Sequence, residues 1–385
     1  MQDSMRFETK TEPALGEMAS TSQETEIVQM EIARKEEASL STVEAASTGM
    51  VLSTGVAPSV NALLSTGKRP VRVAAIDIGT VTCRMLIADV FPNGTLRELA
   101  REYAIANLGE GVDSTHRLKP EAIDRVVAII KRYLGKLREI CNEDAASCSN
   151  PPRVIAVATS ASRDAENADE LASRLHELGI DVRVLPGERE AALSFAGATS
   201  EFPGERVVVV DVGGGSTEVV AGTAGENPMF SRSFDIGCRR ITERFLKSDP
   251  PAKEEIVAAR DWIRSEMASY FEDIRKKNLS DSRMIAVAGT ATTMVSIRES
   301  MARYDASRVH KARVSRENLD AIAKDLAEKT LSDRRGVVGL DPDRAPVIVA
   351  GCLILQAVMD LLGANEFTVS ESDILQGIVL RMTAD

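Results

Sequence analysis

The sequence has few of the residues that build metal or disulfide sites. Its 385 residues include three histidines and five cysteines, and no two cysteines are spaced as Cys-x-x-Cys. An odd number of cysteines argues against a disulfide framework, and the lack of a His/Cys cluster argues against zinc or iron chemistry. An ion bound through oxygen atoms, such as magnesium, stays open. The residues concerned are His116, His176, His310, Cys83, Cys141, Cys148, Cys238 and Cys352.

Long hydrophobic runs and an excess of basic residues are also missing. The most apolar stretch, 345–364, is interrupted by Gln356 and Asp360, which predicts a buried helix rather than a membrane span. The N-terminus is acidic and lacks the apolar segment of a signal peptide, so we expect a cytoplasmic protein without a membrane partner. The net charge of −11 argues against a protein that coats nucleic acid, although a locally positive cleft could still bind a small polyanion.

The first 68 residues are rich in Ser, Thr, Glu and Ala and contain one aromatic residue, Phe7. Such a segment buries too little apolar surface to offset the entropy lost on ordering, so we predict a flexible tail that folding and activity do not need. A short helix over 24–37 is the alternative. Gly67-Lys68 resembles the end of a P-loop, but Ala62 stands where that motif requires glycine.

From residue 71 onward, apolar runs typical of strands alternate with long stretches typical of helices, which predicts an α/β protein. Strands are predicted at 71–78, 84–90, 153–158, 181–185, 207–212, 218–221 and 284–288. Helices are predicted at 120–140, 165–178, 188–196, 253–277 and 316–327.

Two segments, 73–84 and 207–218, resemble each other without gaps. Each has four apolar residues followed by Asp-x-Gly and small hydroxylic residues. The two aspartates, Asp77 and Asp211, are about one domain length apart. We therefore predict two related half-molecules with a cleft between them. The expected organisation is a tail over 1–68, a first domain over 69–204 completed by a C-terminal helix at 372–385, and a second domain over 205–371.

The second of these segments predicts a hairpin with acidic residues on facing strands. If Gly214 and Gly215 form a two-residue turn, Glu218 lies directly opposite Asp211. Facing carboxylates favour a nearby cation, and a glycine-rich turn lets backbone N–H groups approach phosphate oxygens. The alternative is a tight hairpin with two solvated acids. A dinucleotide-binding motif is disfavoured, because Glu218 stands where a third glycine belongs.

Three further segments carry candidate groups. The first hairpin places Arg84 opposite Asp77, which predicts either a structural ion pair or an acid that holds metal or water. Arg163 follows a strand at a predicted helix start and could bind phosphate, or could be an exposed arginine. Glu190 lies in the first turn of a predicted helix, where the helix dipole should keep its carboxylate ionised, ready to deprotonate a water molecule or merely to stabilise the helix.

These motifs, in this order, resemble the exopolyphosphatase and guanosine pentaphosphate phosphohydrolase family, in its short two-domain form. The resemblance runs from about residue 71 to residue 382. The segments that carry it are 75–79, 159–164 with Asn167, 187–191, 211–218, 235–237, 288–292, 309–310, 343–345 and 369–373 with Gly377.

The resemblance implies an α/β fold of two actin/hexokinase-like (ribonuclease H-like) domains and a hydrolase that releases terminal phosphate from polyphosphate or guanosine pentaphosphate. It implies Mg²⁺, or Mn²⁺, as cofactor, and it is compatible with a homodimer. The catalytic residues implied are Glu190, Asp211 and Glu218, and the metal ligands are Asp77, Asp211 and Glu218. The phosphate-binding residues implied are Thr80, Thr82, Ser160, Arg163, Gly213, Gly214, Gly215 and Ser216.

The sequence departs from the family pattern at three positions. Val81 replaces an asparagine, Pro346 an aspartate, and Gln376 an acid. These changes leave the core chemistry intact, but they bear on which substrate the protein prefers. The chain lacks the C-terminal helical domains of longer members, so short chains are the expected substrate. The rival predictions are a kinase of the same fold that uses ATP, and a protein that binds polyphosphate or guanosine pentaphosphate without hydrolysing it.

Overall fold

The fold was examined in a computed structural model, which describes residues 70–144 and 149–382. All of these residues belong to one compact unit, 66–385. The predicted flexible tail lies outside the described residues. Among the helices that the structure describes, none combines the length and apolar character needed to cross a bilayer.

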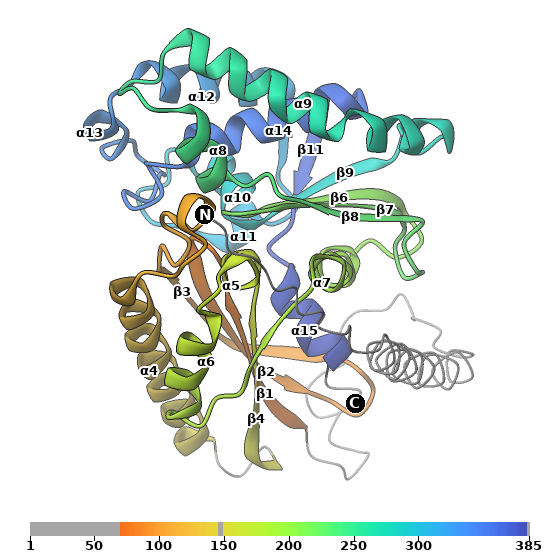
Figure 1. The fold of residues 1–385 in the computed structure, drawn as a ribbon. Coiled ribbons are helices and arrows are strands. Elements are labelled where there is room, and N and C mark those ends of the chain that lie inside the picture. The colour runs from red at the N-terminus through yellow and green to blue at the C-terminus, as the bar shows by residue number, and fades with distance from the viewer. Residues whose placement is uncertain (1–69, 145–148, 383–385) are drawn as a thin grey trace, which may run out of the picture. The chain divides into compact units, whose positions relative to one another are not determined.

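Two mixed sheets form the centre of the fold (Figure 1). The first has the strand order β3-β2-β1-β4-β5, and the second has the order β10-β11-β9-β6-β7-β8. The first sheet comprises β1 (Val71–Ile78), β2 (Thr82–Val90), β3 (Leu96–Ile105), β4 (Ser149–Ala158) and β5 (Val182–Val184). The second comprises β6 (Arg206–Val212), β7 (Thr217–Thr223), β8 (Phe230–Phe234), β9 (Arg283–Val287), β10 (Arg313–Ser315) and β11 (Glu366–Val369).

The two sheets repeat one topology. In the first, β1 pairs antiparallel with β2 and parallel with β4. In the second, β6 pairs antiparallel with β7 and parallel with β9. The internal repeat predicted from the sequence therefore corresponds to a repeated arrangement of strands. The exact domain boundary at residues 204 and 205 stays a prediction.

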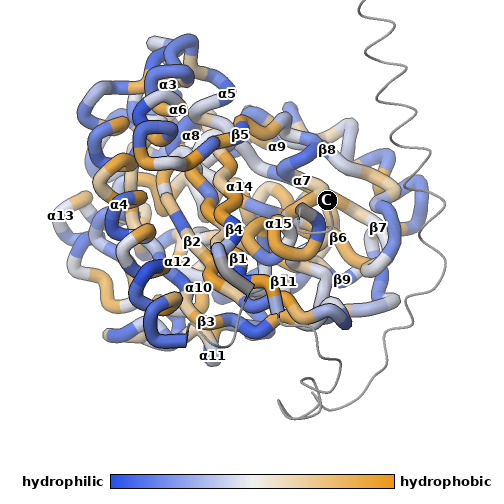
Figure 2. The backbone as a smooth tube through the Cα atoms, turned by 90° about the horizontal axis from the view of Figure 1, so that it is seen from below, coloured by the Kyte–Doolittle hydropathy of each residue, from blue (hydrophilic) through white to orange (hydrophobic). Residues whose placement is uncertain are grey.

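Helices cover both faces of each sheet. The longer ones are α4 (Pro120–Glu143), α6 (Ala168–His176), α7 (Gly187–Thr199), α8 (Cys238–Phe245), α9 (Lys253–Lys276), α10 (Ala288–Arg298), α12 (Arg316–Glu328), α14 (Ile348–Leu362) and α15 (Ile374–Met382). The short ones are α3 (Val112–Thr115), α5 (Ser160–Asp164), α11 (Ala306–Val309) and α13 (Leu331–Arg334). The helix expected within 345–364 is α14, which is buried along nearly its whole length and coloured mainly as hydrophobic in Figure 2.

Helix α7 lies between the two sheets and packs against both. Its Leu193 belongs to the apolar cluster on one face of the first sheet. Its Ala191 and Phe195 belong to the cluster on one face of the second sheet. Because successive side chains on a helix point in different directions, one helix can pack against two sheets. The first turn of α7, which carries Glu190, is thereby held between the two halves.

The last helix, α15, returns from the second sheet to the first and packs on α7. The contact is backbone to backbone: a Cβ atom added at Gly197 would lie 1.8 Å from the carbonyl oxygen of Asp373, and one added at Gly377 would lie 1.9 Å from that of Leu193. Asp373 also begins α15 with a capping box: its carboxylate accepts from the N–H of Leu375, and the side-chain oxygen of Gln376 accepts from the N–H of Asp373. Glycine at two positions and a capping residue thus fix the start of α15 against α7.

The predicted strands and helices are all present, with shifted ends. The last predicted strand, 284–288, ends at Val287, because Ala288 has a positive φ of 65° and begins α10. The helix predicted from residue 165 begins at Ala168, after Asn167, whose side chain is held by the backbone of Leu118. The edge strand β3 and the short strands β8, β10 and β11 were not predicted from the sequence.

Candidate active site

Two hairpins with the same register form the centre of the candidate site. In the first, Asp77 lies opposite Arg84, and the N–H of Gly79 donates to the carbonyl of Thr82. In the second, Asp211 lies opposite Glu218, and the N–H of Gly213 donates to the carbonyl of Ser216. Both pairings confirm the registers predicted from two-residue turns.

The turns of the two hairpins contact each other. A Cβ atom added at Gly214 would lie 2.6 Å from Cγ2 of Val81 and 2.8 Å from Cβ of Thr80. One added at Gly215 would lie 2.4 Å from Oγ of Ser160. The sequence predicts these glycines for the approach of a ligand. In the structure, their missing side chains also leave space for side chains of the other half.

A cavity of about 50 Å³ lies between the hairpins. Ten of the predicted site residues line it: Asp77, Thr80, Thr82, Ser160, Glu190, Asp211, Gly213, Gly214, Gly215 and Ser216. Two do not. Arg163 lies beside it and contacts Glu190, and Glu218 is buried beneath it. The structure therefore brings most of the predicted residues together, while their individual roles stay predictions.

Glu190 is buried at the start of α7 and is held by Arg163, whose Nη1 lies 3.1 Å from its Oε2. Burial raises the pKa of Glu190 to about 8; the charge of Arg163 opposes this shift, and the charges of Asp77 and Asp211 add to it. The expectation that the helix dipole keeps this carboxylate ionised near pH 7 is therefore wrong, because desolvation raises the pKa of Glu190 above 7.

The facing acids of the second hairpin are crowded and held by serines. Ser194 of α7 donates to Asp211 at 2.5 Å, and Ser233 of β8 donates to Glu218 at 2.6 Å. Burial raises the pKa of Asp211 to about 6, and it raises that of Glu218 as well, with further contributions from Glu190 and Asp211. Because like charges raise one another's pKa, this hairpin favours either a bound cation or a bound proton.

Asp77 has one occupied and one free oxygen. Its Oδ2 accepts from Nε and Nη2 of Arg84 at 3.2 and 2.6 Å, whereas its buried Oδ1 has no hydrogen-bond partner. Burial raises its pKa despite the charge of Arg84. A buried carboxylate oxygen without a partner, at a cavity that Asp211 also lines, fits an oxygen-bound cation. Over residues 70–144 and 149–382, however, no group of three acidic, His or Cys side chains could hold an ion, so Asp77, Asp211 and Glu218 do not form a complete ligand set by themselves.

Arg344 is a cavity residue that the sequence does not predict as part of the site. Its buried side chain covers Gly289, where an added Cβ would lie 2.1 Å from Nη2, and it donates to the hydroxyl of Tyr103 at 3.0 Å. Within the described part of the chain no carboxylate forms a salt bridge with it. A buried guanidinium that lacks a carboxylate partner can bind an anion. Arg344 lies in the segment 343–345 of the resemblance, but no local pattern links it to the hairpins.

Comparison with known proteins agrees with this geometry. The chain matches the Ppx/GppA phosphatase family over residues 86–385. It is 38% identical over 327 residues to exopolyphosphatase 2 of Mycobacterium tuberculosis, which covers 81% of this chain and 98% of the relative. The chain belongs to the Ppx/GppA phosphatase family. With the family come phosphoanhydride hydrolysis and the actin-like α/β fold, which confirm the predicted enzyme and fold classes.

Solved structures show the same likeness. An exopolyphosphatase-like protein is similar with a TM-score of 0.73 and 32% identity, covering 82% of this chain and 98% of that one. The Ppx/GppA family member of Aquifex aeolicus gives a TM-score of 0.65 and 28% identity, with 82% and 98% covered. An exopolyphosphatase from Cytophaga hutchinsonii gives 0.71 and 27%, with 81% and 98% covered.

Two departures from the Ppx/GppA pattern have structural explanations. Val81 is buried and lies against Gly214 of the opposite hairpin, so it makes an apolar contact between the two hairpins at the cavity. Gln376 supplies the second half of the capping box at the start of α15. Nothing in the structure explains Pro346, which lies just before α14.

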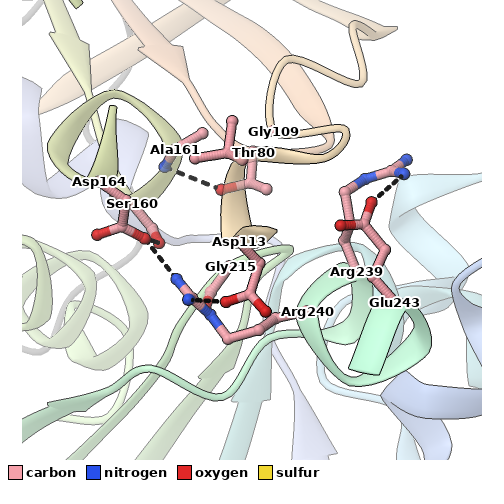
Figure 3. Close-up of a pocket in the computed structure, with 11 residues that line it drawn as sticks. Thr80, Gly109, Asp113, Ser160, Ala161, Asp164, Gly215, Arg239, Arg240 and Glu243 are labelled. Atoms are coloured by element: carbon pink, nitrogen blue, oxygen red, sulfur yellow. Dashed lines mark hydrogen bonds and ion pairs between the residues drawn. The ribbon is translucent and has the colours of Figure 1, made fainter. Parts of the chain in front are cut away.

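A cluster of arginines on α8 closes one side of the hairpin turns in this Ppx/GppA protein (Figure 3). Arg240 donates to the carbonyl of Gly215 at 2.8 Å and forms ion pairs with Asp113 and Asp164. Arg244 forms a second pair with Asp113 at 2.6 Å. Every one of these contacts joins the second half of the molecule to the first, or holds the glycine turn between them. Arg240 and Arg244 are therefore paired with carboxylates, whereas Arg344 has no carboxylate partner within the described residues.

Proposed function

We propose that this protein is an exopolyphosphatase that releases orthophosphate from the end of inorganic polyphosphate in the cavity between the hairpins. The observation that carries the proposal is the pairing of Glu190 with Arg163 at a cavity that also exposes a glycine turn and two acids. A proton acceptor beside an anion-binding guanidinium is what hydrolysis of a phosphoanhydride by water requires.

In the proposed reaction, the terminal phosphate lies against the backbone N–H groups of the glycine turn. Arg344 and Arg163 bind its oxygens through charge-assisted hydrogen bonds. Glu190 holds the attacking water and accepts its proton, for which a pKa near the working pH is favourable. Ser194 keeps the Asp211 carboxylate in place at the same cavity.

Magnesium is the proposed cofactor, and manganese could replace it. Oδ1 of Asp77 and the carboxylate of Asp211 would hold the ion, with substrate oxygens and water completing its coordination. When bound, the ion would neutralise negative charge on the phosphates and the acids. We expect no turnover in chelator and recovery on adding magnesium; full activity in chelator, or activity restored by zinc alone, would contradict the assignment.

Within this class, we propose that the preferred substrate is a short polyphosphate chain. Guanosine pentaphosphate is the second candidate substrate. The test is phosphate release with magnesium from tripolyphosphate, long-chain polyphosphate and guanosine pentaphosphate at equal concentrations of terminal phosphate. Release from none of the three, or transfer from ATP to an acceptor instead, would overturn the proposed function.

A further inference from the structure

Asp373 is an acidic residue in contact with Arg84, which lines the cavity, and the hydrolysis reaction does not explain its role. It lies in the segment that connects β11 to α15 and is buried. Its carboxylate forms an ion pair with Nη1 of Arg84 through Oδ2, while its Oδ1 accepts from the N–H of Leu375. One carboxylate thus caps α15 and also neutralises an arginine that lines the cavity.

Arg84 forms ion pairs with two carboxylates. Its Nε and Nη2 donate to Asp77, and its Nη1 donates to Asp373. Each of its three nitrogens therefore donates to a carboxylate, and two negative charges offset its positive charge, although Arg84 lines the cavity. Of the two arginines that line the cavity, Arg344 is the one without a carboxylate partner within the described residues.

The position of the Asp373 backbone is fixed by its packing against α7. The Asp373 carbonyl rests on Gly197 of α7, the helix that also carries Glu190 and Ser194. The contact leaves no room for a side chain at Gly197, so the backbone of Asp373 is held against α7. This position brings its carboxylate to Arg84, which lines the cavity.

We infer that Asp373 is a positioning residue that keeps Arg84 on Asp77 and away from phosphate, so that the cavity accepts phosphoanhydrides together with a divalent cation and rejects the free anion. The inference rests on the proposed function. Each carboxylate near the cavity opposes a polyanion and favours a cation. By occupying Arg84, Asp373 removes a positive group that would otherwise bind phosphate without metal.

The test is the substitution Asp373→Asn, which removes the charge and keeps a good helix-capping side chain. In chelator, we expect inorganic tripolyphosphate to bind about tenfold more tightly to the variant, as measured by calorimetry. Without phosphate, we expect Mn²⁺, followed by electron paramagnetic resonance, to bind about tenfold more weakly. A merely structural defect would weaken both ligands, so opposite shifts identify the electrostatic role.

Two controls separate the possible causes. Gln376→Ala breaks the capping box but keeps the Asp373 charge, and it should leave both affinities within about twofold. In an Arg84→Gln background, Asp373→Asn should lose most of its gain for tripolyphosphate, because the guanidinium to be released is absent. Equal gains in both backgrounds, or unchanged affinities in the single variant, would overturn the inference.

Binding is measured here without turnover, so the outcome is independent of the proposed function. If the native protein does not release phosphate from polyphosphate, the proposed function is wrong, but the affinities of the Asp373→Asn variant can still be measured and compared. If Asp373→Asn does not fold, as judged by its thermal unfolding, Asp373→Ser offers a second neutral cap for the same two measurements.

Discussion

The two hairpins share a backbone pattern and differ in the charge across the pair. Asp77 faces Arg84 in the first, and Asp211 faces Glu218 in the second, at the same register position. The first pair forms an ion pair at 2.6 Å. The second brings two buried acids together, held only by serine hydroxyls. The same hairpin geometry thus holds an acid paired with an arginine in the first half and two facing acids in the second half.

This difference shows that two hairpins of the same fold can have different electrostatic roles. In the opposite-charge pair, the arginine offsets the charge of the acid and leaves only Oδ1 of Asp77 without a hydrogen-bond partner. In a like-charge pair, the repulsion between the two carboxylates is relieved only when a proton or a cation is bound, so the second hairpin is suited to bind one of them. Glu190 faces both hairpins, since the charges of Asp77 and Asp211 both raise its pKa.

The largest effect is expected at the residue between the hairpins. Glu190→Gln keeps the size of the side chain but cannot accept a proton, so kcat should fall by roughly 10²–10⁴, or about 3–5 kcal/mol. Substrate affinity should persist or improve, because a negative charge has left the cavity. Steady-state kinetics with tripolyphosphate and magnesium measure both quantities.

Arg163→Ala is the matched comparison for Glu190→Gln. It removes a positive group and should weaken substrate binding as well as turnover, which a loss of the base alone would not do. If Glu190→Gln folds normally and keeps a near-native kcat, the base lies elsewhere, and Asp211 or Glu218 becomes the first candidate.

The second prediction breaks each hairpin in turn. Arg84→Gln leaves buried acids without their cation and should lower the free energy of unfolding by about 3 kcal/mol. Glu218→Gln relieves the crowding around Asp211 and keeps an acceptor for Ser233, so its effect should stay within about 1 kcal/mol. Urea unfolding of both variants in chelator checks the contrast, and equal losses would show that the two pairs are energetically alike.

The third prediction concerns the contact between the turns. Gly214→Ala places a methyl group against Val81 and Thr80 and should destabilise the protein by about 1–3 kcal/mol. Adding Val81→Ala should restore part of the loss, because it removes the nearest atom. Thermal unfolding of the single and double variants tests this coupling; purely additive losses would place the strain elsewhere.

The last prediction concerns pH. Glu190, with a pKa raised to about 8 from 4.5, binds more protons in the folded than in the unfolded state between these values. The ligand-free protein should therefore lose stability as the pH rises through this range, and Glu190→Gln should flatten the slope. Unfolding by urea at pH 5.5 and 8.5 in chelator measures it. Stability that rises with pH to the same extent in both proteins would contradict the raised pKa.

The local geometry of the site could be predicted from the sequence. A continuous apolar run before each of Asp77 and Asp211, with a two-residue turn between strands, predicts one register for each hairpin. The repeat of that pattern also predicted two related halves. The register of each hairpin depends on residues within about ten positions of one another.

Contacts between distant segments could not be predicted in this way. The approach of Arg344 to Gly289 and of Asp373 to Arg84 joins the C-terminal part of the chain to elements far earlier in it. The pKa of Glu190 was misjudged for the same reason, since its first-turn position is local but its desolvation comes from two sheets packed around α7.

The sequence by itself determined the fold class, the register of both hairpins and which acids face each other, because short-range sterics and side-chain alternation decide them. Only the tertiary structure decided which charges are neutralised. Burial and the packing of α15 on α7 place Asp373 against Arg84 and leave Arg344 without a carboxylate partner among the described residues. Electrostatic energy in a protein interior depends on every charge and dipole within several ångströms, and most of these come from distant parts of the chain.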